Sequence, residues 1–185
     1  MEFNPLPSFT TPNLILRQIK EEDLNHIHYM RTLPQMIEYV DMKLDNDLNE
    51  TLVYINRMNK GIMENKWVIW AIEHKSDKKV IGTISVWNFD ENKTKAELGY
   101  GIIPAYQNFG YMSEALDWIV DAAFNTYRLK SIYAYTEENN KSSIRLLEKA
   151  KFIYDSKVNE EGYFKKGILT MLVYRKDNLR SEYNV

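Results

Sequence analysis

Cysteine is absent from the 185 residues of this chain. That absence excludes a disulfide framework, a thiolate metal site, an iron–sulfur cluster and a cysteine nucleophile. A dominant charge is also lacking, because 24 basic residues nearly balance 26 acidic residues and leave a net charge of −2. The composition therefore gives no reason to expect nucleic acid or an anionic membrane as a partner.

Long apolar runs are missing as well. No stretch approaches the roughly 20 residues that a membrane-spanning helix needs. Residues 1–17 lack the basic and apolar regions of a secretory signal, so we expect a cytoplasmic protein. The sequence shows no repeats and no linker rich in Pro, Gly or Ser. A single domain over residues 1–185 is therefore the expectation.

What is present is the composition of a globular protein, with 44% hydrophobic and 27% charged residues. Apolar periodicity predicts helices over 21–32, 47–62, from about 113 to 124 and over 140–150. β-Branched and aromatic residues predict strands at 14–16, 67–73, 80–87, 96–103 and 131–136, with two more around the Glu161-Gly162 turn. Asp47 and Glu50 form a capping-box pattern. The order predicts a mixed α/β domain in which most neighbouring strands are hairpins.

The segment from Glu97 to Glu114 is the most informative part of the chain. Because side chains alternate along a strand, Glu97, Gly99 and Gly101 share one face. Two glycines beside a carboxylate leave a trough for another backbone or a ligand; the alternative is a β-bulge with a surface glutamate. A glycine-bearing loop, 107–112, then leads into a helix whose first N–H groups and positive dipole end favour a phosphate. The spacing fits neither a dinucleotide fingerprint nor a P-loop.

Two motifs carry a resemblance. The first, Gln/Arg-x-x-Gly-x-Gly/Ala, has Gln107, Gly110 and Met112 in its three slots. The second, Asn-x-x-Ser-x-x-Leu-x-x-Lys-x-Gly-Phe, matches at Asn140, Ser143, Leu146, Lys149 and Phe152, with Lys151 in place of glycine. With the opening at 11–17, they resemble the GNAT superfamily of acetyl-CoA-dependent N-acetyltransferases. The chain looks most like the branch that acetylates the N-terminal alanine or serine of ribosomal proteins.

The resemblance implies a GNAT-like single domain, α/β or α+β mixed, with a twisted, mostly antiparallel sheet flanked by helices and split as a V between its fourth and fifth strands. Acetyl-CoA would be the acetyl-donor cosubstrate, and its pantetheine would pair with the backbone at Ile102 and Ile103. The pyrophosphate would lie on the loop of Gln107, Asn108, Phe109, Gly110, Tyr111, Met112 and Ser113. Asn140 would touch the pantetheine arm or the thioester, and Ser143 would flank the cofactor; helix capping is the alternative for both.

Transfer of acetyl to an amine needs a base, since only a neutral amine attacks a thioester. Glu97 is the candidate, and the alternative is a cross-strand partner for a basic residue such as Lys79. Many GNAT enzymes place a tyrosine where this chain has Leu147, so Asn140, a hydroxyl such as that of Ser143, or water would have to assist the leaving thiolate. No metal is expected, and without cysteine the transfer would be direct.

The acceptor is predicted to be a primary amine, most simply a protein N-terminus. At pH 7, deprotonation costs roughly 1 kcal/mol for an α-amino group but nearly 5 kcal/mol for a lysine, at about 1.36 kcal/mol per pKa unit. Five acidic residues could attract a cationic amine or form a solvated loop: Glu38, Asp41, Asp45, Asp47 and Glu50. The alternatives are an acetyltransferase of a small amine (an aminoglycoside, polyamine or amino sugar) and a non-catalytic acyl-CoA-binding module. A homodimer through the edge of the last hairpin also stays open.

Overall fold

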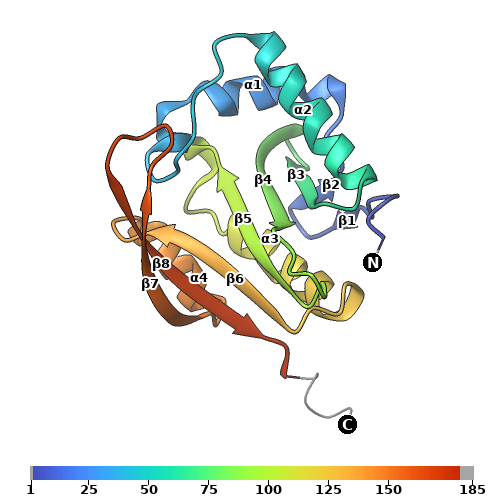
Figure 1. Cartoon of the computed structure of the whole chain (residues 1–185). Helices are drawn as coiled ribbons and strands as arrows, with labels where there is room; N and C mark the ends of the chain where they lie inside the picture. The colour runs from blue at the N-terminus through green and yellow to red at the C-terminus, as the bar shows by residue number, and fades with distance from the viewer. Residues whose placement is uncertain (1, 180–185) are drawn as a thin grey trace.

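The structure is a computed structural model, and it describes residues 2–179. An eight-stranded sheet in the order β1-β2-β3-β4-β5-β6-β8-β7 runs through the molecule (Figure 1). The strands are β1 (Phe9–Thr10), β2 (Leu14–Arg17), β3 (Val68–His74), β4 (Lys79–Trp87), β5 (Lys95–Ile102), β6 (Ser131–Glu137), β7 (Ile153–Glu161) and β8 (Ile168–Asp177). Each neighbouring pair is antiparallel except β5 and β6, which are parallel.

Helices cover both faces of this sheet (Figure 1). The α-helices are α1 (Leu24–Thr32), α2 (Leu48–Met63), α3 (Tyr111–Asp121) and α4 (Lys141–Lys149). Three short 3₁₀ segments are η1 (Glu21–Asp23), η2 (Pro34–Ile37) and η3 (Pro104–Tyr106), and the π-helical η4 (Ala122–Thr126) continues α3. α1 and α2 pack over β3 and β4, whereas α3 contacts β2 and β4 and α4 contacts β6.

Side-chain alternation assigns the two faces of the sheet. Trp70, Ile84 and Tyr100 are register partners on successive strands and therefore point to the same face. That face is the one covered by α3, since Phe9 contacts Trp70 and also stacks on Trp118 of α3, with centroids 4.7 Å apart. The opposite face carries the odd-numbered residues of β5 from Glu97 onward.

The mixed α/β fold predicted from the sequence is confirmed. The two-residue strand β1 was not predicted, because Phe9 and Thr10 are too few to give a periodic signal. The predicted fourth and fifth strands are therefore β5 and β6. α3 begins at Tyr111, two residues before the predicted start at Ser113.

The predicted capping box of α2 is half right. Asp47 accepts the N–H of Glu50 at 2.9 Å, as a capping residue does. The Glu50 carboxylate, however, accepts the N–H of Asn46 at 2.9 Å and not that of Asp47. The reciprocal bond is thus made one residue further out.

Candidate active site

The two parallel strands at the centre of the sheet separate from one another. β5 and β6 pair only from Lys95↔Ser131 to Leu98↔Ala134. Beyond these pairs both strands continue, and Figure 1 shows them diverging, β5 toward α1 and β6 toward the β7–β8 hairpin. The V predicted between these two segments is therefore present.

The backbone of β5 faces the opening of the V at two residues. Ile103 donates its N–H to Ile81 at 2.9 Å, so the hydrogen-bonded pairs of β4 and β5 fall at the odd-numbered residues of β5. The N–H and C=O groups of Tyr100 and Ile102 therefore point away from β4 and toward the gap. Gln107 already donates its side-chain N–H to the Ile102 carbonyl at 3.0 Å.

Ile103 departs from the prediction that it offers its backbone to the pantetheine arm. Its N–H is bonded to Ile81, and its C=O accepts the N–H of Tyr106 at 3.0 Å. The edge open to an extended ligand lies one to three residues earlier. Sequence alone does not reveal which backbone groups point outward, because this depends on the register with β4.

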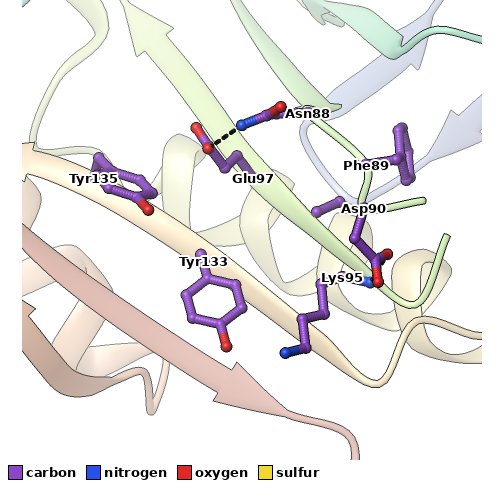
Figure 2. A pocket seen from close by; sticks show the side chains of 8 residues that line it. Asn88, Phe89, Asp90, Lys95, Glu97, Tyr133 and Tyr135 are labelled. Carbon is purple, nitrogen blue, oxygen red and sulfur yellow. Dashed lines mark hydrogen bonds between the residues drawn. The ribbon is translucent and has the colours of Figure 1, made fainter. Parts of the chain in front are cut away.

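Glu97 lies at the base of the V, on the face opposite α3. It lines an open cavity of about 380 Å³ together with Asn88, Phe89, Asp90, Lys95, Ala96, Tyr133 and Tyr135 (Figure 2). The side chain of Asn88 donates a hydrogen bond to the Glu97 carboxylate. Tyr133 is the register partner of Glu97 on β6, so the two side chains stand next to each other on one face.

Burial raises the pKa of the Glu97 carboxyl above its ordinary value. The hydrogen bond from Asn88 acts in the opposite direction, and the nearby negative charge of Glu160 raises the pKa further. Tyr135 responds in the same way: burial and the charges of Glu97 and Glu160 raise the pKa of its phenol. A carboxylate held partly out of water beside a cavity has the environment of a general base.

Both alternatives for the Glu97 region are wrong. Its cross-strand partner is Trp87, whereas Lys79 lies at the far end of β4 opposite His74. The β4–β5 register runs without interruption from Glu97 to Ile102, so no bulge is present there.

The glycines of β5 make room for neighbouring side chains. A Cβ on Gly99 would lie 2.8 Å from the Ser85 hydroxyl, and one on Gly101 would lie 3.1 Å from the Met36 methyl group. The Gly101 carbonyl would itself lie only 2.3 Å from a Cβ on Gly82. The predicted trough is therefore partly filled from β4 and η2, which brings these elements close to the site.

The loop before α3 has the geometry of an anion-binding turn. Asn108 and Gly110 both have positive φ, 66° and 86°, and Gly110 is the N-cap of α3. The first hydrogen bond of the helix runs from the Glu114 N–H to the Gly110 carbonyl at 3.0 Å, so the N–H groups of residues 111–113 precede it. The side chain of Met112 is buried in the core, and its departure from the family pattern changes packing rather than the backbone donors.

A cluster of aromatic and histidine side chains contacts this loop, and it was not predicted from the sequence. The Nε2 of His74 lies 3.1 Å from the Tyr111 hydroxyl, and its Nδ1 lies 3.0 Å from the Asp77 carboxylate. Tyr106 donates a hydrogen bond to the same carboxylate. Phe109 is exposed and stacks on Tyr111 with centroids 5.8 Å apart. The only available signal was the density of aromatic residues between 106 and 111.

The second motif lies at the start of α4. The side-chain Oδ1 of Asn140 accepts the Ser143 N–H at 3.1 Å, so Asn140 is the N-cap of this helix. The hydroxyl of Ser143 is 2.7 Å from that of Tyr100. Leu147 is fully buried in the core. Lys149 lines a small cleft of about 60 Å³ with Ser113, Asp117 and Ala150.

The acidic residues 38–50 do not form a free negative wall. Asp45 binds Arg31 through two hydrogen bonds of 2.7 and 2.8 Å, and Asp47 and Glu50 cap the start of α2 as described above. Asp41 accepts backbone N–H groups of the β7–β8 turn, with distances of 2.9 Å to Phe164 and 2.8 Å to Lys165. We call this contact the Asp41 clasp. It joins the segment after η2 to the turn between β7 and β8.

Within residues 2–179, no three His, Asp or Glu side chains are placed to hold a metal ion. No helix in the same range is both long and apolar enough to cross a membrane.

Comparison with known proteins identifies the family. The family of the acetyltransferase (GNAT) domain matches residues 13–153. The uncharacterized N-acetyltransferase YoaA of Bacillus subtilis (strain 168) is 28% identical over 169 residues, 91% of this chain and 89% of the relative. The chain therefore belongs to the GNAT acetyltransferase family. It is an N-acetyltransferase, as its motifs predicted.

Solved structures match over nearly the whole chain. Ribosomal-protein-S5-alanine acetyltransferase from Vibrio fischeri matches with a TM-score of 0.82 and 21% identity over 94% of this chain and 97% of that one. Spermidine N-acetyltransferase from Vibrio cholerae, solved with CoA and spermine, matches with a TM-score of 0.78 and 20% identity over 90% and 96%. At such identities the likeness shows the fold. The acceptor class stays open between proteins and small amines.

Proposed function

We propose that this protein transfers the acetyl group of acetyl-CoA directly to the N-terminal α-amine of a protein, with Glu97 as the general base. The half-buried carboxylate of Glu97, beside a cavity and at the point where β5 and β6 part, is the observation that carries the proposal. Residues 1–185 would act as one acetyltransferase domain. A ribosomal acceptor, as in the Vibrio fischeri protein, would place the reaction in the cytoplasm.

The V fits acetyl-CoA on two counts. The backbone groups of Tyr100 and Ile102 face the gap and would pair with an extended arm like a further strand. The N–H groups of residues 111–113, at the positive end of α3, would hold the pyrophosphate.

Glu97 would take the proton that the amine must lose. The raised pKa of its carboxyl makes it a stronger base than an exposed glutamate once ionised. An α-amino group has a pKa of about 7.7–8.0, so removing its proton at neutral pH costs little free energy. A lysine has a pKa of about 10.4, so the same deprotonation costs much more and needs a stronger base. A modest base therefore favours an N-terminus over a lysine side chain.

The second candidate is acetylation of a small polyamine. The observation that favours it is the pair of carboxylates at Glu97 and Glu160, which together raise the pKa of Tyr135 and would attract a second positive charge. The spermidine N-acetyltransferase of Vibrio cholerae shares the fold. Both candidates use the same base and donor site and differ only in what enters the cavity.

A thiol-release assay with acetyl-CoA separates the candidates. The panel contains peptides beginning with alanine or serine, spermidine, an aminoglycoside and an amino sugar, all at equal concentration. Turnover of the peptides is the expected result. Turnover of the small amines alone would favour the second candidate, and tight acetyl-CoA binding without any turnover would indicate a non-catalytic acyl-CoA-binding module.

A further inference from the structure

The loop that leads into α3 has few hydrogen bonds of its own. Asn108 and Gly110 have φ of 66° and 86°, a conformation that is costly for asparagine. Gly110 is the N-cap of α3 and has no side chain with which to cap it. The N–H groups of residues 108–110 donate no backbone hydrogen bond to another described residue. The shape of this loop therefore depends on side chains that contact its two ends.

One imidazole contacts both ends of the loop. His74 is the last residue of β3, and its Nε2 lies 3.1 Å from the hydroxyl of Tyr111, the first residue of α3. The two rings have centroids 4.9 Å apart. On the other side, the ring of His74 meets Tyr106 of η3 edge-on, with centroids 5.4 Å apart. The residue just before the loop and the residue just after it are thus joined through His74.

Asp77, in the turn between β3 and β4, orients this imidazole. Its carboxylate lies 3.0 Å from the buried Nδ1 of His74, an electrostatic contact rather than an aligned hydrogen bond. The hydrogen bond from Tyr106 holds the pKa of Asp77 below its ordinary value and raises the pKa of the Tyr106 phenol to about 12. Because a carboxylate only accepts, a neutral His74 carries its hydrogen on Nδ1 and accepts the Tyr111 hydroxyl hydrogen at Nε2.

We propose that His74 is a positioning residue for the acetyl-CoA site. By holding Tyr106 and Tyr111, it keeps the loop in the shape that aims the first N–H groups of α3 at the pyrophosphate. The inference rests on the proposed function, because it requires the pyrophosphate at this end of α3. His74 acts through Tyr111 and not on the reacting atoms, so its effect is on the affinity for the donor. A loop that is ordered before binding loses less conformational freedom when the ligand binds.

Two variants remove the contact and leave every backbone N–H of the loop in place. His74→Phe keeps a ring between Tyr106 and Tyr111 but lacks both nitrogens, and Tyr111→Phe lacks only the hydroxyl. Each should raise the Kd for CoA by about 2- to 10-fold, the scale of one net hydrogen bond, as measured by isothermal titration. The double variant should match His74→Phe, because the two residues act through the same contact.

The kinetics of two donors show whether the pyrophosphate is what the loop holds. With acetyl-CoA, both variants should raise KM in proportion to the Kd and keep the wild-type kcat, because Glu97 and its cavity are unchanged. Acetyl-pantetheine carries the same thioester without the pyrophosphate, so its kcat/KM should be equal in wild-type protein and variants. A loss of kcat/KM with acetyl-pantetheine as large as that with acetyl-CoA would overturn the inference.

Asn59→Ala is the control for a general loss of stability. It removes two side-chain hydrogen bonds of α2, of 3.1 Å to Gln18 and 3.0 Å to the Ile19 carbonyl, and should lower the Tm without changing the Kd for CoA. An equal rise of the Kd in this variant would overturn the inference. The same Kd in wild-type protein, His74→Phe and Tyr111→Phe would overturn the inference alone. Failure of wild-type protein to bind CoA would contradict the proposed function and the inference with it.

Discussion

Replacing Glu97 by glutamine removes the proposed base with little other change. The side chain keeps its length, and its amide oxygen can still accept the hydrogen bond from Asn88. The substitution removes the negative charge at position 97 and with it the repulsion from Glu160. The variant should therefore be at least as stable as the wild-type protein, so unfolding would not explain a lower rate of acetyl transfer.

The expected loss is large in rate and specific in its pH dependence. A positioned general base contributes about 10²- to 10⁴-fold, so kcat/KM should fall by that factor at pH 7, or roughly 3 to 5 kcal/mol of transition-state stabilisation. Because the pKa of Glu97 is raised, its carboxylate form appears at a higher pH than that of an ordinary glutamate. The wild-type kcat/KM should therefore rise as the pH increases through the pKa of Glu97. The variant should lack this rise and keep only the ionisation of the amine.

Thiol release from acetyl-CoA, followed from pH 5 to 9 at saturating donor, measures both effects. Glu160→Gln is the matched comparison: it keeps the base but removes a charge that raises its pKa, so the same rise should move to lower pH. A Glu97→Gln enzyme that binds acetyl-CoA normally and turns over like the wild type across this range would refute the assignment.

Three further predictions concern the backbone and the clasp. Gly110→Ala should raise the Kd for CoA, because a φ of 86° is strained for alanine. Gly167→Ala is the control: its φ is 113° and the space around it is equally open, so the variant should lose stability and leave that Kd unchanged. Isothermal titration measures the Kd of each variant, and thermal melts measure its stability. Lys151→Gly should raise the free energy of unfolding by about 0.5–1 kcal/mol, because lysine here has φ of 64° where the family pattern has glycine. Urea denaturation measures this change, and a lower free energy of unfolding in the variant would contradict it. Asp41→Asn should lower the protection of the amides of residues 163–165 against hydrogen exchange, measured relative to unprotected amides at the same pH. In the wild type this protection should also fall in acid, because the backbone bonds lower the pKa of Asp41 and their stabilisation is lost as pH falls through that pKa. Unchanged protection in both cases would contradict the clasp.

The sequence predicted the fold well because periodicity and turn residues mark most of its elements. The hairpins and the strong amphipathic face of α3 depend on local pattern, and they are observed. β1 was not predicted because a strand of two residues gives no periodic pattern. The partner of Glu50 was predicted one residue away from the observed one, because residue types do not determine the path of the backbone before a helix. Local sequence patterns therefore predicted the order of most helices and strands, but not the two-residue strand or the exact capping partner.

The candidate site was predictable where it depends on one segment and not where it depends on contacts between segments. Gly110 and Asn140 stand at helix starts, as short motifs can indicate. The Tyr100–Ser143 bond spans 43 positions, and the Asp41 clasp joins residues more than 120 apart, so neither leaves a local signal. The acidic residues 38–50 looked like one surface, yet several of them have separate partners.

The position of the transferred acetyl group tests the central claim most directly. Two peptides of identical sequence, each with an internal lysine, are incubated with the protein and acetyl-CoA; one has a free N-terminal alanine or serine, and the other has a blocked N-terminus. Tandem mass spectrometry then locates the acetyl group. We predict acetylation of the free α-amine and none of the lysine in either peptide. Acetylation of the lysine, or of spermidine alone in the same mixture, would contradict the account.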